Sequence, residues 1–295
     1  MECQTAFDGT STGNENNDGK THQKCIFYDM LHSNNAARVR IWLRLHGGLE
    51  DQVERIVISH NDLHNGMLEH INPLKKVPAF RTDKGLALFE SFVIMQYLED
   101  RFGNSIETSS SSDSSIPSLL LDTPDDRAFC HLLVRVHDLY ISSPNCTQPH
   151  FSHTQGCMYL DPVPTNFTPA SRTMDVHTRA AKLADMYKHL VWMERQIRLP
   201  YLAGLRLSHA DCTWFPTCVF MEYLLPHVFG WSPIFHESIH FPKWSTWFAT
   251  CRLNPHFEST YQEIHGTLLR HQQLGRFELV KQVVQDHSEF QWKYI

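Results

Sequence analysis

The spacing of hydrophobic and polar positions divides the chain into two parts that meet near residue 104. In the first part, apolar runs within residues 25–30 and 51–59 are typical of strands, and residues 34–45 carry apolar side chains at helical spacing. Two further short apolar runs flank a Thr-Asp-Lys-Gly turn and predict a hairpin, and an apolar helix follows it. The predicted hairpin strands are residues 79–81 and 87–89, and the predicted helix is residues 90–101.

The expected order of elements, β-α-β-α-β-β-α, is that of a thioredoxin-like domain, in which the first two strands pair in parallel. The second part lacks strand alternation and predicts an all-α domain. Its predicted helices are residues 124–140, 171–198, 208–229 and 242–252. Ser208 and Asp211 have the spacing of a capping box at the start of the most apolar of these helices.

Local composition sets the expected boundaries. Residues 1–23 are rich in Asn, Gly, Thr and Asp and carry no export or organellar signal, so we predict a disordered arm. Residues 104–122 are rich in Ser, Thr, Pro and Asp, which is typical of a linker. The sequence therefore predicts a thioredoxin-like domain over residues 24–103 and an all-helical domain over residues 123–295.

Charge and cysteine content exclude several classes of protein. A net charge of -6 over 295 residues, with no basic stripe, argues against nucleic-acid binding. The most hydrophobic stretch, residues 212–231, contains Glu222 and two prolines and is a poor membrane span. Eight cysteines are too few for a disulfide scaffold, so reduced thiols and a cytoplasmic location are expected.

The most specific motif is Asn-Pro-Leu-Lys-Lys-Val-Pro at residues 72–78, followed by Glu90 and Ser91 at the start of an apolar helix. A Val-Pro bond can be cis at modest cost, and a cis-proline turn leaves the backbone of Val77 open to pair with a short peptide. This combination closely resembles the N-terminal domain of cytosolic glutathione transferases, particularly the serine-type theta and zeta classes. The resemblance is strong over residues 24–103 and weaker to about residue 260.

The resemblance implies the glutathione transferase fold, with glutathione as co-substrate. Glu90 and Ser91 would hold the γ-glutamyl ammonium and carboxylate groups, and the backbone of Val77 would pair with the cysteinyl residue. Lys76 matches a family lysine beside it. His64 lies one residue from the position of a family histidine that reaches the glycyl end.

Glutathione chemistry requires a thiol with a free pKa near 8.5 to become a thiolate at neutral pH. Ser33 lies six residues before Val39, which is the spacing of the catalytic serine in the resembling classes. We predict that its hydroxyl donates a hydrogen bond to the glutathione sulfur. A serine here is also a good helix N-cap, and the two roles are compatible.

Other groups near Ser33 are weaker candidates. Tyr28 is the tyrosine that a Tyr-type enzyme would use, but its place inside a strand favours a core role. Cysteine chemistry is excluded because no cysteine occurs between Cys25 and Cys130. His32 and Asn34 flank the serine and are possible helpers.

The family fold places the electrophile pocket beside the first helix of the second domain and the segment after it, residues 145–160. The pocket-lining candidates are aromatic or sulfur-containing, and each could equally be a core residue. They are Tyr140, Phe151, Met158, Tyr159, Trp214 and Phe215.

Two cysteines and two histidines in the same segment have the spacing C-x3-H-x2-H-x3-C. They are Cys146, His150, His153 and Cys157. Such side chains can bind zinc, but the spacing is not that of a standard zinc finger, and the chain contains 20 histidines. No metal site is expected.

The prediction that follows is a glutathione transferase that attacks a hydrophobic electrophile or a peroxide, in a detoxification role. One alternative is a glutathione-dependent isomerase or reductive dehalogenase. Another is a non-catalytic binding or assembly module with the same fold. The resemblance also implies a homodimer, with neither nucleic acid nor membrane as partner.

Overall fold

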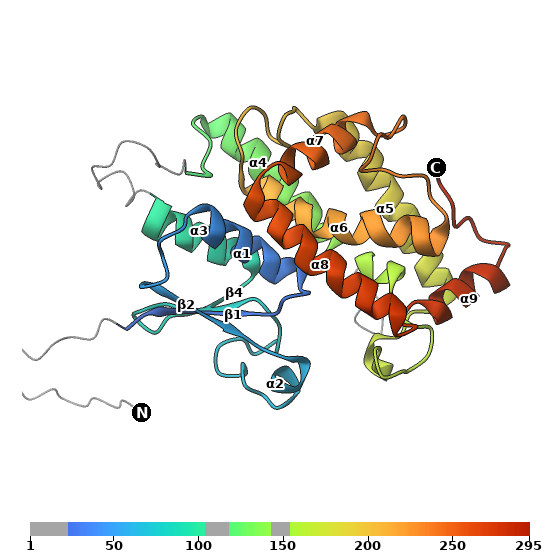
Figure 1. Cartoon of the computed structure of the whole chain (residues 1–295), viewed down its shortest axis with the longest axis horizontal. Coiled ribbons are helices and arrows are strands. Elements are labelled where there is room, and N and C mark those ends of the chain that lie inside the picture. Colours follow the sequence, from blue (N-terminus) through green and yellow to red (C-terminus); the bar gives the residue numbers. More distant parts are fainter. Residues whose placement is uncertain (1–22, 104–117, 143–153) are drawn as a thin grey trace, which may run out of the picture.

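The computed structural model describes residues 23–103, 118–142 and 154–295 (Figure 1). Its N-terminal part contains a four-stranded sheet of order β2-β1-β3-β4, in which β1 and β2 are parallel and the other neighbouring pairs are antiparallel. This confirms the thioredoxin-like domain. The elements are β1 (Cys25–Asp29), α1 (Asn34–Leu45), β2 (Val53–Val57), α2 (His60–His64), β3 (Ala79–Arg81), β4 (Ala87–Phe89), α3 (Ser91–Leu98) and the π-helical turn η1 (Glu99–Gly103).

Successive side chains of β1 point to opposite faces of the sheet, and a hydrophobic core lies on each face. Phe27 is fully buried and faces the side covered by α1 and α3, where it belongs to the same hydrophobic cluster as Trp42. Tyr28 points to the opposite face, which α2 covers (Figure 1), and packs in a second cluster with Leu68 and Ile71. Tyr28 is therefore a core residue.

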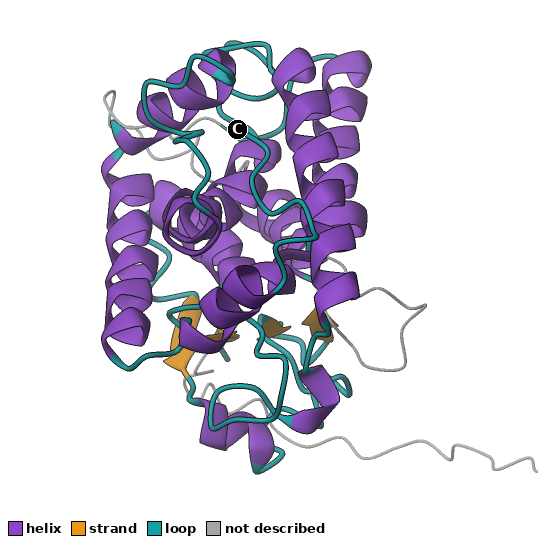
Figure 2. Cartoon of the chain, turned by 90° about the vertical axis from the view of Figure 1, so that its right-hand side faces the viewer, coloured by secondary structure: helices purple, strands orange, loops and turns teal. Residues whose placement is uncertain are grey.

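The C-terminal part is helical and lies above the sheet domain in the view of Figure 2. Its elements are α4 (Pro124–Val136), η3 (His137–Ile141), η4 (Thr154–Met158), η5 (Ala170–Arg172), α5 (Val176–Gln196), α6 (His209–Phe229), α7 (Pro242–Arg252), α8 (Pro255–Gln273) and α9 (Glu278–Asp286). Helix α6 is buried along nearly its whole length, which explains why its sequence is apolar on every side. No helix in the described ranges is both long and apolar enough to cross a membrane.

Two helical predictions differ from the structure, and two helices had no prediction. The helix expected at residues 171–198 begins only at Val176, because Asp175 caps it by accepting from the Thr178 N–H. The helix expected at residues 124–140 changes into the π-helical turn η3 after Val136. Helices α8 and α9 were not predicted.

The signal for α8 was nevertheless present in the sequence. Phe257, Tyr261, Ile264 and Leu268 recur at spacings of four, three and four, and all four are buried. This is the apolar stripe of a helix that packs on one face.

Helix α1 joins the two parts of the molecule. Arg44 forms an ion pair with Glu263 of α8 and donates to the Thr260 hydroxyl at 2.9 Å. At the start of α1, Asn34 donates to the Thr217 hydroxyl of α6 at 2.8 Å. These contacts fix both ends of α1 against the helical part, and the groove described below opens beside its N-terminal end.

Candidate functional site

A groove of about 230 Å³ lies between the thioredoxin-like domain and the helical part. Four of the residues that the sequence predicted to bind glutathione line it: Lys76, Val77, Glu90 and Ser91. Pro78 and Asn72, from the same motif, line it as well. The remaining lining residues are Asn35 and Arg38 of α1, Arg135 of α4, Asp138 and Leu139 of η3, and Ser142.

The Val77-Pro78 peptide bond is cis, as the motif predicted. Asn72 is buried and holds the turn by donating to the Lys76 carbonyl at 2.9 Å and accepting from the Leu74 N–H at 3.0 Å. Within the described part of the chain, neither the N–H nor the C=O of Val77 makes a hydrogen bond. Both groups are therefore available to an extended peptide in the groove.

Glu90 and Ser91 lie where β4 ends and α3 begins. Glu90 has φ 70° and ψ 112°, which is an unfavourable conformation for a residue with a side chain and typically costs about 1–3 kcal/mol. Ser91 is buried at the first position of α3. The free N–H groups of that helix start and the Glu90 carboxylate can together recognise a group that carries both an anion and an ammonium.

Arg38 connects Ser91 to the helical part, which no local sequence pattern predicted. Its guanidinium donates to the Ser91 hydroxyl at 3.2 Å and to the Asp138 carboxylate at 2.7 Å. It also lies 2.6 Å from Nδ1 of His137, whose Nε2 is 2.8 Å from the Thr217 hydroxyl.

Electrostatics fix the charges in this network. Burial raises the pKa of Asp138, but the Arg38 guanidinium and His137 outweigh it and hold that pKa well below its usual range. Burial, reinforced by Arg38, lowers the pKa of His137 to about 4. At neutral pH the network therefore holds a charged Arg38–Asp138 pair and a neutral His137 that accepts from Arg38 through Nδ1.

This burial predicts a pH dependence of stability. His137 and His209 are both buried, and burial lowers the pKa of each to about 4. An unfolded histidine titrates near 6.5, so below about pH 6.5 the unfolded chain binds protons that the folded protein does not. The stability present above that pH is expected to fall by up to about 1.4 kcal/mol per pH unit for each histidine as the pH drops toward 4.

Chemical denaturation at several pH values between about 7.5 and 4.5 measures this slope. The slope should be smaller in His137→Gln than in the wild type, whereas His240→Gln, at an exposed histidine, should leave it unchanged. A stability that stays constant over this range in the wild type would contradict the expectation.

The remaining predicted site residues are more dispersed. Ser33 caps α1, accepting from the Ala36 N–H at 3.2 Å, and is not among the lining residues of the groove. Its hydroxyl donates to none of the described residues. Asn34 faces away and donates to Gln155 and Thr217, while Asn35 lines the groove.

His64 is the last residue of α2, and its side chain lies outside the described part of the structure. His32, the residue before Ser33, has its ring centroid 6.2 Å from that of His271 in α8. Lys76 lines the groove; burial lowers the pKa of its ammonium, and the nearby Arg172 lowers it further.

The predicted electrophile-pocket residues separate into two groups. Met158, Trp214 and Phe215 are completely buried in the hydrophobic core and do not line the groove. Tyr140 is half exposed and stacks on His189 at 4.9 Å between ring centroids, while its neighbour Leu139 lines the groove. Tyr159 is half-buried against Phe220, and Phe151 lies outside the described residues.

Most of the cysteine and histidine cluster also lies outside the described residues, namely Cys146, His150 and His153. Cys157 is fully buried, and burial raises the pKa of its thiol to about 12. Among the described residues, no three His, Cys, Asp or Glu side chains are grouped as metal ligands.

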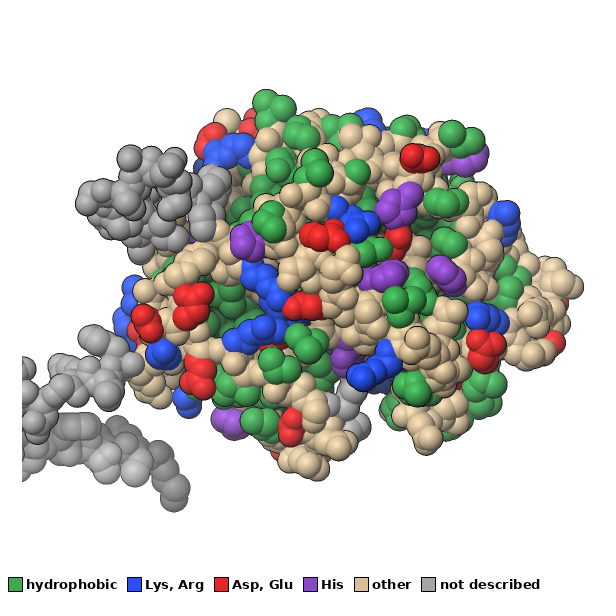
Figure 3. Space-filling model, viewed as in Figure 1, with side chains coloured by type: hydrophobic (Ala, Val, Ile, Leu, Met, Phe, Trp, Pro, Cys, Tyr) green, Lys and Arg blue, Asp and Glu red, His purple; other side chains and the backbone are tan. Residues whose placement is uncertain are grey.

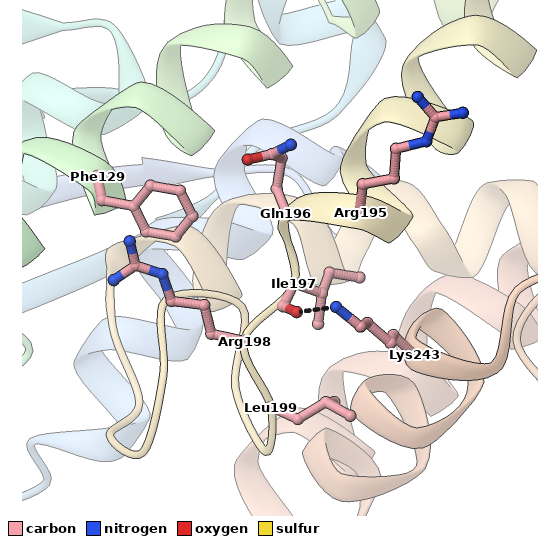
Figure 4. A pocket seen from close by; sticks show the side chains of 7 residues that line it. All are labelled: Phe129, Arg195, Gln196, Ile197, Arg198, Leu199 and Lys243. Atoms are coloured by element: carbon pink, nitrogen blue, oxygen red, sulfur yellow. Dashed lines mark hydrogen bonds between the residues drawn. The ribbon is translucent and has the colours of Figure 1, made fainter.

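A second, larger groove of about 420 Å³ lies between the middle of α4, the end of α5 and the start of α7 (Figure 4). Two of its three lining cations already have partners. The Arg198 guanidinium lies 3.7 Å from the centre of the Phe129 ring, and the Lys243 ammonium donates to the Ile197 carbonyl at 2.8 Å. None of the motif residues reaches it, so the groove at Val77 is the candidate site.

A thioredoxin-like domain with a cis-proline turn, closed by a helical part across a groove, defines the glutathione transferase fold. Residues 32–101 match the family model "Glutathione S-transferase, N-terminal domain". No curated protein matches the chain. The family match is confined to the N-terminal domain, and the likeness to solved structures shows that the whole described chain has the glutathione transferase fold.

Solved structures with this fold come from different classes. Glutathione transferase Omega 3C from Trametes versicolor is 21% identical with a TM-score of 0.57, over 86% of this chain and 94% of its own. A glutathione S-transferase from Methylobacillus flagellatus, solved with GSH bound, is 15% identical with a TM-score of 0.58, over 80% and 98%. A bacterial zeta-class maleyl pyruvate isomerase is 17% identical with a TM-score of 0.56, over 81% and 97%. These similar scores establish the fold and do not select a class.

Proposed function

We propose that the protein is a glutathione transferase that binds glutathione in the groove at Val77 and activates its thiol for attack on a hydrophobic electrophile or a peroxide. The observation that carries this proposal is that the cis Val77-Pro78 turn and the Glu90–Ser91 pair line one groove. The open backbone of Val77 pairs with the cysteinyl residue. Ser91 and the start of α3 hold the γ-glutamyl carboxylate, and Glu90 accepts from the γ-glutamyl ammonium.

In this proposal Ser33 stabilises the thiolate. Its Oγ accepts from the Ala36 N–H, which leaves the hydroxyl hydrogen free to point at a sulfur. The dipole of α1, whose N-terminus begins at the next residue, adds to the stabilisation of an anion there. Lowering the thiol pKa by about two units requires roughly 3 kcal/mol, which a hydroxyl donor and a helix N-terminus can supply together.

Glutathione binding measured by isothermal titration calorimetry tests the site directly. Ser91→Ala is expected to weaken binding by about tenfold or more, because it removes a charge-assisted hydrogen bond to the γ-glutamyl carboxylate. Ser288→Ala, at an exposed serine near the C-terminus, is the matched control and should bind like the wild type. An unchanged affinity for glutathione in Ser91→Ala would contradict the assignment of the γ-glutamyl carboxylate to Ser91.

Two other outcomes correspond to the alternative functions. A wild-type protein that shows no affinity for glutathione at millimolar concentration would be a binding or assembly module with a transferase fold. Turnover of a cis-unsaturated diacid to its trans isomer without net consumption of glutathione would identify an isomerase.

A further inference from the structure

A row of aromatic and cationic side chains extends from the residue beside Ser33 into the helical part. The His32 ring lies 6.2 Å from the ring of His271, which lies 6.3 Å from the ring of Phe167. The Arg276 guanidinium lies 5.2 Å from the Phe167 ring centre and 5.9 Å from that of Tyr159. We call Tyr159, Phe167, His271 and Arg276 the acceptor shelf.

Two observations link the acceptor shelf to the candidate site. His32 directly precedes Ser33, and Arg172 is close enough to Lys76 of the groove to lower the pKa of that lysine, although burial is the larger cause. Figure 3 shows basic and histidine side chains near the lower edge of the molecule, between the lobe that carries α2 and the lobe of the segment before α5.

Arg276 is the notable member of the shelf. It is half-buried, and burial lowers the pKa of its guanidinium. Within the described ranges its guanidinium makes no hydrogen bond, and its close contacts are the two ring faces. A partly desolvated guanidinium with open donors binds a carboxylate well because its planar fork matches both oxygens.

Two positive charges and one negative charge act around the shelf. The negative charge is that of Asp161, which acts on Arg276 and accepts from the Thr165 hydroxyl at 2.5 Å. Arg172 acts on the same Tyr159 hydroxyl as Arg276, and its charge adds to the positive potential of the shelf. Positive charge therefore exceeds negative charge around the half-buried rings of Tyr159 and Phe167.

We propose that the preferred electrophile is a planar carboxylic acid, bound with its ring or double bond against Tyr159 and Phe167 and its carboxylate on Arg276. This inference rests on the proposed function, because it names the substrate class of the same site. With an aryl chloride the glutathione sulfur forms a bond to the ring carbon. The carbon–chlorine bond breaks, chloride leaves with its electron pair, and the thiol proton goes to solvent.

The test compares two acceptors that differ in charge, 4-chloro-3-nitrobenzoate and 4-chloro-3-nitrobenzamide. The wild type is expected to show a kcat/KM for the acid at least about tenfold above that for the amide, although the carboxylate makes the ring chemically less reactive. In Arg276→Gln this ratio should fall by about tenfold or more, and in Arg276→Lys it should fall less. Arg195→Gln, at an exposed arginine on another face, should keep the wild-type ratio.

Equilibrium binding of the two glutathione conjugates, from the acid and from the amide, provides a readout without turnover. The wild type should bind the acid conjugate more tightly, and Arg276→Gln should lose that difference. If Arg276→Gln does not fold, the ratio of kcat/KM for the acid to that for the amide, measured in the wild type and in Arg276→Lys, still tests the acceptor assignment.

The outcomes separate the two levels of the proposal. A wild type that binds glutathione but uses the amide as well as the acid would overturn the acceptor assignment and leave the proposed function standing. A wild type that binds neither glutathione nor its conjugates would overturn both.

Discussion

Replacing Asp211 with alanine is expected to lower the free energy of unfolding by about 3–5 kcal/mol, enough to unfold much of the protein at physiological temperature. Asp211 is completely buried and accepts from the N–H and hydroxyl of Ser208, the N–H of Leu202 and the indole N–H of Trp247. Alanine would leave several of these buried donors without an acceptor, and each unpaired donor costs about 1–3 kcal/mol.

Chemical denaturation monitored by circular dichroism measures the loss. Asp125→Ala is the matched control, since Asp125 is also an acidic residue in the first turn of a helix but is exposed, so its loss should cost less than about 1 kcal/mol. Equal losses in the two variants would show that Asp211 acts only as an ordinary helix cap.

Replacing Ser33 with alanine is expected to lower kcat/KM for glutathione conjugation by about 100-fold or more, with glutathione affinity largely preserved. Removing one preorganised hydrogen-bond donor to the anion in an active site typically lowers the rate by about this factor. The pH profile should change as well, because the apparent pKa of the bound thiol should rise toward the free value of about 8.5. Steady-state kinetics and a spectroscopic titration of the thiolate measure the two effects.

The structure provides a competing donor. Asn35 lines the groove whereas Ser33 does not, and its side-chain oxygen accepts from the Ser142 hydroxyl at 3.3 Å. Asn35→Ala is therefore the informative companion variant. If Ser33→Ala keeps both turnover and the low thiol pKa while Asn35→Ala loses them, then Ser33 is a helix cap and Asn35 is the activating residue.

The loss of the Ser33 cap must be measured separately. Alanine at an N-cap typically costs about 0.5–2 kcal/mol of stability, so the unfolding of Ser33→Ala should be followed alongside its kinetics. A small stability loss with a large loss of turnover supports a chemical role.

Local sequence rules were sufficient for the first domain. The alternation in β1, the turn before β4 and the start of α3 are short-range patterns, and the structure places each element where the pattern predicted it. The cis Val77-Pro78 turn and the capping box of Ser208 and Asp211 were also readable, because each depends on residues close together in the chain. The end of α4 was not predicted, because packing against the rest of the molecule decides where a helix stops. Helix α9 was missed although Val280, Val283 and Val284 recur at helical spacing and pack against the core.

The candidate site was predictable only in part. Lys76, Val77, Glu90 and Ser91 belong to a contiguous domain with a recognisable motif, and they meet in the groove. The pocket residues Met158, Trp214 and Phe215 were chosen by residue type, and type alone does not distinguish a core side chain from a lining one.

By itself, the sequence determined the thioredoxin-like domain, the helical nature of the second part and the cis-proline motif, since hydrophobic spacing and turn chemistry act over a few residues. Only the tertiary structure decided that Arg38 joins Ser91 to Asp138, and that Arg276 lies between Phe167 and Tyr159. Each cation is separated from these partners by 53 to 117 positions in the chain. The partners of a buried or half-buried cation are the groups that the fold places next to it. A local sequence pattern does not contain this information, because the groups come from distant parts of the chain.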